Sequence, residues 1–273
     1  MTMDQGRLRR IRNFQSEDWY PALVIRPLTI LIMLVIGDVK CLTPNRLTTL
    51  ANLFKLAGAA LIVPAWAAWV GLAPWPATVT AVVLLQLGIL FDHLDGTMAR
   101  YRRTFTTFGS YYDKASDLIT WYPIVLAVGW RAYRESGDAV MIILVSASAG
   151  LLAMRGYLKW LSFAESQKLR WHEAAADPAG VLARYTAPPT ISEPPDRTPG
   201  DWLRWFGKMS IRCVAFEEMD LFFWIGLGLL IDRLELLCWV LFLSQLPGFV
   251  LMTIVRHRDA HRIDVAMRQY KPG

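Results

Sequence analysis

The chain has 273 residues, of which 54% are hydrophobic and 19% charged, and its mean hydropathy is +0.31. A soluble domain has about 25% charged and roughly 45–50% apolar residues, so this chain carries more apolar surface than one soluble core buries. The composition excludes intrinsic disorder, a collagen and a disulfide-rich secreted module, and it favours a membrane protein. The net charge of +6 indicates contact with a membrane surface and not with nucleic acid, because basic residues gather on the cytoplasmic flanks of membrane spans.

Residues 1–40 are expected to form a cytoplasmic N-terminus and an interfacial amphipathic helix. The stretch 21–37 is apolar but contains Arg26 and two prolines, and its charge-free part, 28–37, is too short to cross a bilayer. We therefore expect this stretch to lie on the membrane before the first span. A seventh span is the alternative.

Six later stretches are apolar enough for transmembrane helices, which need about 20 mainly apolar residues. They lie at approximately 45–70, 76–99, 110–130, 138–162, 213–231 and 236–255. The sequence thus predicts an all-α, polytopic membrane domain over 41–255, with six transmembrane helices. The segments placed inside would carry 21 Lys and Arg against three in the outer connections, which predicts that both termini are cytoplasmic.

Two cytoplasmic segments are expected outside the spans. The long connection at about 164–209 begins with helix-forming residues, and we expect an amphipathic helix there that is broken near Pro178. Its next part, 186–200, is rich in proline and is expected to be extended. A basic cytoplasmic tail is expected over 256–273.

Four aspartates occur where a membrane protein normally avoids charge, and ionisable residues in spans indicate function. Asp92 and Asp95 are three apart near the end of the second span, and Asp113 and Asp117 are four apart near the start of the third. Each pair shares a helix face. The short basic turn between them would make the two helices antiparallel neighbours, so all four carboxylates would converge near the cytoplasmic side.

Carboxylate oxygens favour Mg²⁺, Mn²⁺ or Ca²⁺ as the bound cation, and the neighbouring His93 is expected on a different helix face from Asp92 and Asp95. Two such ions a few ångströms apart would suit phosphoryl transfer. Gly96 and Gly109 remove side chains beside the aspartates, as the approach of a bulky ligand to the helix backbone would require. Either glycine could instead serve helix packing in the membrane.

The aspartates belong to a longer pattern, which reads D-x-x-D-G-x-x-A-R over 92–100 and, after eight residues, G-x-x-x-D-x-x-x-D over 109–117. This pattern resembles the signature of the CDP-alcohol phosphotransferase (CDP-alcohol phosphatidyltransferase) family. Upstream, Pro44, Asn45 and Thr48 resemble the family's Pro-Asn-x-x-Thr element, which opens the first span.

The resemblance implies a six-span enzyme of the membrane, commonly a homodimer, with an interfacial N-terminal helix. It implies transfer of a substituted phosphoryl group, here a phosphatidyl group, from CDP-diacylglycerol or another CDP-alcohol to an alcohol acceptor, with release of CMP. Such an enzyme would serve phospholipid biosynthesis in a bacterial inner membrane, with its active site facing the cytoplasm.

The resemblance also implies roles for individual residues. Asp92, Asp95 and Asp113 would hold two divalent ions, Mg²⁺ or Mn²⁺, and Asp117 would be the general base and a further metal ligand. The residues that would bind the CDP donor are Gly96, Ala99, Arg100, Gly109, Asn45 and Thr48.

The signature leaves the acceptor open. A phosphate-bearing acceptor would use the basic candidates at the end of the fourth span and the start of the fifth, which are Arg155, Lys159 and Arg212. A cationic amino alcohol would instead use the acidic candidates, which are Glu217, Glu218 and Asp220. The greater number of basic residues favours a phosphorylated or polyhydroxyl acceptor. Alternatively, Arg155 and Lys159 extend to lipid headgroups and the acidic residues pair with them.

Three other interpretations stay open. The same chemistry could use a water-soluble donor and product, as in inositol-phosphate phosphotransferases. A divalent-cation transporter is disfavoured, because the carboxylates lie near one membrane face and not at the midplane. An inactive membrane protein is disfavoured by the intact signature.

Overall fold

A computed structural model of the protein describes residues 5–12, 19–186, 198–201, 203–204, 207, 217–268 and 270. Within these residues every regular element is a helix, which confirms the predicted all-α class for the described part of the chain. The proline-rich segment 187–197 and most of 202–216 lie outside the described residues, so their predicted structure stays a prediction.

The helices follow one another with mostly short connections. The N-terminal part contains α1 (Gln5–Arg12), a π-helical turn (Pro21–Ile25) and α2 (Arg26–Ile36). The remaining helices are α3 (Pro44–Ile62), α4 (Pro64–Trp69), α5 (Pro74–Arg102), α6 (Thr107–Ser136), α7 (Val140–Ala176), α8 (Pro178–Thr186), α10 (Glu218–Leu230) and α11 (Leu234–Arg268).

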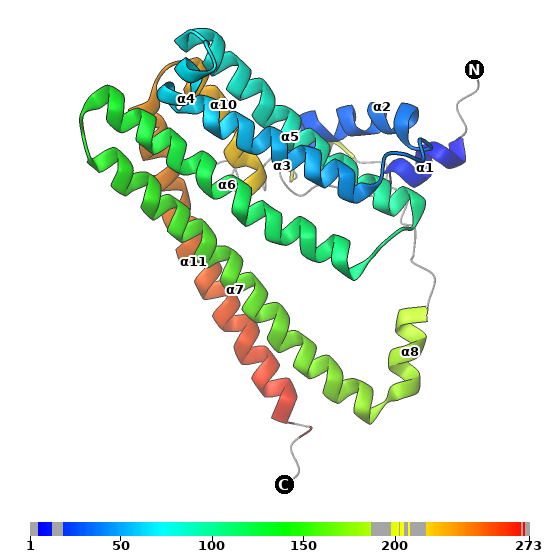
Figure 1. The fold of residues 1–273 in the computed structure, drawn as a ribbon. Coiled ribbons are helices and arrows are strands. Elements are labelled where there is room, and N and C mark those ends of the chain that lie inside the picture. Colours follow the sequence, from blue (N-terminus) through cyan, green and yellow to red (C-terminus); the bar gives the residue numbers. More distant parts are fainter. Residues whose placement is uncertain are drawn as a thin grey trace.

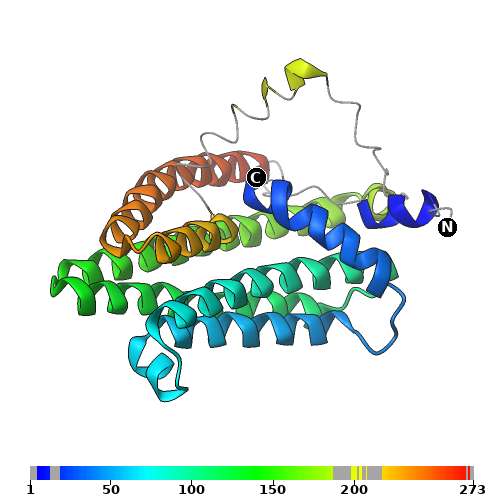
Figure 2. The ribbon, with the colours of Figure 1, turned by 90° about the horizontal axis from the view of Figure 1, so that it is seen from above.

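The bundle has a three-helix half, formed by α3, α5 and α6, and a long helical pair, formed by α7 and α11. In the first half, α3 packs against both α5 and α6, and α10 packs on α5 (Figure 1). In the second, α7 pairs with α11, and the far ends of these two helices project together beyond α6 (Figure 1). Helix α2 crosses the outside of the bundle over α5 (Figure 2). The sequence predicted α5 and α6 as antiparallel neighbours, whereas in the structure α3 lies against both of them.

Side-chain caps fix the starts of α3 and α6. The backbone N–H of Arg46 donates to Oγ1 of Thr43 at 3.4 Å, and Pro44 occupies the first turn of α3. The backbone N–H of Gly109 donates to Oγ1 of Thr106 at 2.9 Å at the start of α6. These caps fix the starts of two of the three helices that carry candidate site residues.

Several predicted boundaries are corrected by the structure. The stretch predicted as one span over 45–70 is two helices, because Val63 has extended backbone (φ −80°, ψ 116°) before Pro64. A residue before proline is disfavoured in the helical region, which explains the break. Helix α7 continues through Ala176, beyond the predicted end at 162, and the break before Pro178 is confirmed. Helix α11 likewise continues into the predicted tail.

Among the described helices, three are both long and apolar enough to cross a membrane, namely α5, α7 and α11. Two shorter apolar stretches lie at 21–36 and 219–230. Helices α3 and α6 have the length of a span but carry polar and charged residues of the candidate site. The helices are thus consistent with an integral membrane protein, whereas the number of spans stays a prediction.

Candidate active site

Three carboxylates from two helices converge in the bundle. One carboxylate oxygen each of Asp92 and Asp95 on α5 and of Asp113 on α6 lies within 4.8 Å of the others. Asp92 is 8% exposed and Asp95 5% exposed, and Asp113 is half-buried. The prediction that all four aspartates converge is thus confirmed for these three. Their hard oxygen atoms are the ligands that Mg²⁺ and Mn²⁺ prefer.

Helix α3 supplies polar partners to these carboxylates. The hydroxyl of Thr48 donates to Oδ2 of Asp95. The ammonium of Lys55 donates to Oδ1 of Asp92 at 3.1 Å and to Oδ1 of Asp117 at 3.2 Å. Thr48 and Lys55 are two turns apart on one helix face. The site is therefore enclosed by three helices, and α3 connects the aspartates of α5 with those of α6.

Lys55 lies among the aspartates of the candidate site, and the sequence interpretation missed it. It is 1% exposed, and its stem passes over Gly88 of α5, where an added Cβ would lie 2.6 Å from Cγ of Lys55. The available signal was a lysine inside the apolar stretch 45–70, because a charge within a span indicates function. Spacing within the aspartate signature carries no information about a partner some forty residues earlier.

Asp117 on α6 is the second aspartate that Lys55 contacts. Its side chain is 21% exposed, and its Oδ1 is bound by Lys55. The structure thus places Asp117 beside Asp92 through a shared ammonium. Its predicted roles as general base and metal ligand stay predictions.

At two glycines of the signature, neighbouring side chains lie close to the helix backbone. At Gly109, an added Cβ would lie 2.9 Å from Oγ1 of Thr106 and 3.2 Å from Oδ1 of Asn45. A side chain at position 109 would therefore have to displace the capping hydroxyl of Thr106 or the amide of Asn45. At Gly96, an added Cβ would lie 3.4 Å from the guanidinium nitrogens of Arg100. Arg100 folds back along α5 over this glycine, and Ala99 beside it is half-buried.

The N-terminal region is attached to the same part of α5 through Arg26. This residue is 7% exposed. Its guanidinium donates to Oγ1 of Thr97 at 2.9 Å and to the carbonyl oxygen of Ile11 at 2.8 Å. Arg100 also donates to Oγ1 of Thr97, at 3.5 Å. Thr97 therefore connects the N-terminal helices with the predicted donor-binding segment.

The basic acceptor candidates on α7 differ in their surroundings. Arg155 is 6% exposed and donates to Oε1 of Gln245 on α11 at 2.6 Å. Its guanidinium also lies 3.8 Å from Glu217, which precedes α10. Lys159, one turn later on α7, is exposed. Arg212 lies outside the described residues.

Asp220 has a structural contact with the N-terminal region. It is fully buried, and its Oδ1 accepts a hydrogen bond from the backbone N–H of Tyr20 at 3.1 Å. Asp220 thus attaches α10 to the segment that leads into α2. The side chain of Glu218 lies outside the described residues.

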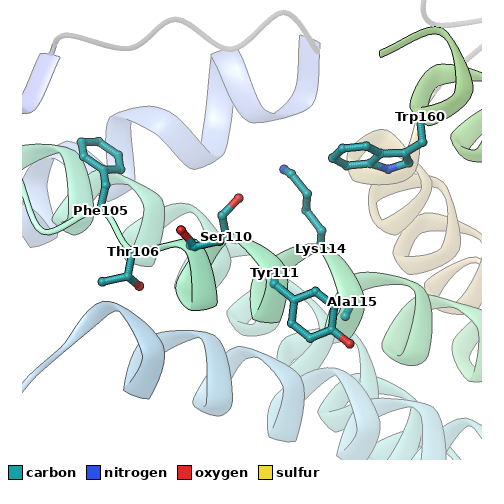
Figure 3. A pocket seen from close by; sticks show the side chains of 8 residues that line it. Phe105, Thr106, Ser110, Tyr111, Lys114, Ala115 and Trp160 are labelled. Carbon is teal, nitrogen blue, oxygen red and sulfur yellow. The ribbon is translucent and has the colours of Figure 1, made fainter. Parts of the chain in front are cut away.

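A cavity of about 740 Å³ lies between the start of α6 and α7 (Figure 3). It is lined by Phe105, Thr106, Thr107, Ser110, Tyr111, Lys114, Ala115 and Trp160. The side chain of Lys114 points into it, with Nζ 5.5 Å from the Trp160 ring centroid (Figure 3). Among the described residues, those predicted for metal, donor or acceptor binding do not line this cavity.

Comparison with known proteins adds one finding. Residues 43–187 match the family model described as CDP-alcohol phosphatidyltransferase. The matched segment spans more than half of the chain and contains helices α3 to α8, with all four aspartates of the signature. No curated protein matches the chain.

Proposed function

This chain belongs to the CDP-alcohol phosphatidyltransferase family, and we propose that it transfers a phosphatidyl group from CDP-diacylglycerol to an alcohol acceptor and releases CMP. The observation that supports this function is the convergence of Asp92, Asp95 and Asp113 from two helices to within 4.8 Å. Such a transfer would serve phospholipid biosynthesis.

The donor set fits divalent cations. Carboxylates this close repel one another strongly in a buried site, and a cation removes that repulsion. Asn52 on α3 lies between Thr48 and Lys55, and its buried Oδ1 has no hydrogen-bond partner among the residues that the structure describes. An amide oxygen is a further ligand type for Mg²⁺. Two divalent ions, Mg²⁺ or Mn²⁺, would neutralise the phosphate charge of the donor in the working complex.

Asp117 is proposed as the general base. Its carboxylate would accept the proton of the acceptor hydroxyl, and the contact with Lys55 at 3.2 Å orients it. The alcohol oxygen then forms a bond to the phosphorus that carries the diacylglycerol. The bond from this phosphorus to the bridging oxygen breaks, and that oxygen leaves as part of CMP.

The donor would lie along α5 and the starts of α3 and α6. Gly96, Ala99 and Gly109 would let the donor approach the helix backbone, and Asn45 and Thr48 would contact it from the start of α3. Arg100 is proposed as the counter-charge for a donor phosphate. Because its guanidinium lies over Gly96 in this structure, donor binding at that glycine would turn Arg100 outward.

The acceptor is proposed to be phosphorylated or polyhydroxylated. A buried guanidinium suits a phosphate group, because charge-assisted hydrogen bonds to phosphate are strong. Arg155 is the candidate that is already buried and oriented, through its bond to Gln245. This residue also supports the second candidate function, an inositol-phosphate phosphotransferase of the same family with a soluble donor and product.

The proposed setting is a six-span protein of the bacterial inner membrane. The interfacial helix would precede the spans, both termini and the active site would face the cytoplasm, and two copies would form a homodimer. The three long apolar helices and the two shorter apolar stretches support the membrane part of this proposal.

The test uses membranes from cells that express the protein, with radiolabelled CDP-diacylglycerol, Mn²⁺ or Mg²⁺ and a panel of alcohols. We expect CMP release and one labelled lipid product that depends on a particular alcohol. Membranes with Asp92→Asn provide the matched control. Transfer only from a water-soluble CDP-alcohol would favour the second candidate, and absence of transfer from every donor would contradict the proposal.

A further inference from the structure

We propose that Lys55 is a built-in cation of the aspartate cluster, which limits the substrate-free protein to one bound divalent ion and keeps Asp117 out of that ion's ligand set. This inference rests on the proposed function, because it concerns the same aspartates. It makes Lys55 a positioning residue, since Lys55 would act through Asp92 and Asp117.

The position of the ammonium group divides the four aspartates into two sets. One oxygen each of Asp92, Asp95 and Asp113 forms the compact group that fits a divalent ion. The ammonium of Lys55 lies at hydrogen-bond distance from Asp92, at 3.1 Å, and from Asp117, at 3.2 Å. Asp92 therefore belongs to both sets, and Lys55 occupies the side of Asp92 from which a second ion would reach Asp117.

The surroundings hold Lys55 in this position. The side chain is 1% exposed, and its stem fills the gap that Gly88 leaves on α5. The ring of Phe222 on α10 lies 5.7 Å from Nζ, within the range of a cation–π contact. Three helices besides α3 therefore contribute to the enclosure of one ammonium group. A lysine that merely reaches toward solvent from a membrane helix would show none of these contacts.

The formal charge of the cluster also favours one divalent ion over two in the substrate-free protein. Four ionised carboxylates and Lys55 carry a formal charge of about −3, and one divalent ion reduces it to about −1. A second divalent ion would bring the formal charge of a buried cluster to about +1, next to the ammonium. The second ion is therefore favoured only when a donor supplies negative phosphate oxygens. Without the charge of Lys55, the empty cluster would attract divalent ions more strongly.

The test measures Mn²⁺ binding to the purified full-length protein by electron paramagnetic resonance, without nucleotide. We expect one ion per chain for the wild type, and two ions or at least about tenfold tighter binding for Lys55→Met, which keeps most of the side-chain volume but removes the charge. Lys55→Arg is the matched control, because it keeps the charge and should retain one ion. Mn²⁺ should also raise the unfolding temperature of Lys55→Met more than that of the wild type.

Two ions bound to the wild type without nucleotide would overturn the inference, whether or not the variants fold. Unchanged number and affinity of ions in Lys55→Met would overturn it as well. Asp113→Asn separates this failure from that of the proposed function, because it should weaken Mn²⁺ binding in either case. If the wild type binds no Mn²⁺, both the metal site of the proposed function and the role of Lys55 fail together.

Discussion

Two of the buried cations, Lys55 in the three-helix half and Arg155 in the long helical pair, differ in their partners. Lys55 is 1% exposed and lies between two aspartates of the signature. Arg155 is 6% exposed, donates to the neutral amide oxygen of Gln245 at 2.6 Å and lies 3.8 Å from Glu217.

The difference indicates different uses of a buried charge. An ammonium between two carboxylates neutralises and positions them, so the charge of Lys55 serves the site itself. The hydrogen bond to Gln245 orients the Arg155 guanidinium, and the half-exposed carboxylate of Glu217 lies 3.8 Å from it. Arg155 is proposed to bind an anionic group of an incoming molecule, which would compete with Glu217 for this guanidinium.

The largest expected effect concerns the proposed metal ligands beside Lys55. Replacing Asp92, Asp95 or Asp113 by Asn removes a charged ligand and should lower the rate of CMP release at least about 10²-fold. Chelation with EDTA should abolish activity, and added Mg²⁺ or Mn²⁺ should restore it. Full activity in one of these variants would remove that aspartate from the site.

The next effect distinguishes the proposed role of Asp117 from that of the other three aspartates. Asp117→Asn should lower transfer about 10²-fold because the general base is lost, while donor affinity is retained. Calorimetric titration of the CDP donor into the variant measures the affinity directly. If donor affinity falls without a separate defect in rate, Asp117 would be a metal ligand and not the base.

The contrast between these two regions also shows what the sequence could predict. The meeting of Asp92, Asp95 and Asp113 follows from helix periodicity and a short turn, both of which are local. Contacts across helices, such as Lys55 with Asp117 or Arg155 with Gln245, depend on which helices pack together. Periodicity alone does not determine that packing, and the central position of α3 was accordingly not predicted.

Three further features differ in how far the sequence could predict them. The break at Val63 could have been predicted from Pro64, because the residue before a proline avoids the helical region. For Gly109 the sequence left two interpretations open, room for a ligand and helix packing, and the structure gives a packing reason at the start of α3. The burial of Asp220 against the backbone of Tyr20 carries no local signal in the sequence.

A smaller effect tests the Arg155 side of the comparison. Arg155→Ala should raise the Michaelis constant for a phosphorylated acceptor about 10- to 100-fold, because a hydrogen bond to a charged group contributes about 1.5–3 kcal/mol. Glu217→Gln is the matched control and should change this constant little. A rise confined to Glu217→Gln, with choline or ethanolamine as the working acceptor, would reverse the assignment.

The smallest effect concerns Gly88, which leaves room on α5 for the stem of Lys55. Gly88→Ala would place a Cβ 2.6 Å from Cγ of Lys55 and should lower the free energy of unfolding by about 1–3 kcal/mol through overpacking. Gly150→Ala on α7 is the control, because open space surrounds that position and alanine favours the helix. Thermal unfolding of both variants in detergent measures the difference. Equal unfolding temperatures would show that Lys55 is not held by this contact.

The nucleotide product of the purified protein tests the central claim most directly. Cytidine-labelled CDP-diacylglycerol is supplied with Mn²⁺ and the acceptor found in the membrane assay, and the labelled nucleotide is identified by chromatography. The proposed transfer predicts CMP, released in equal amount to the lipid product and absent with Asp92→Asn. Release of CDP, or a lipid product formed without any nucleotide, would contradict it.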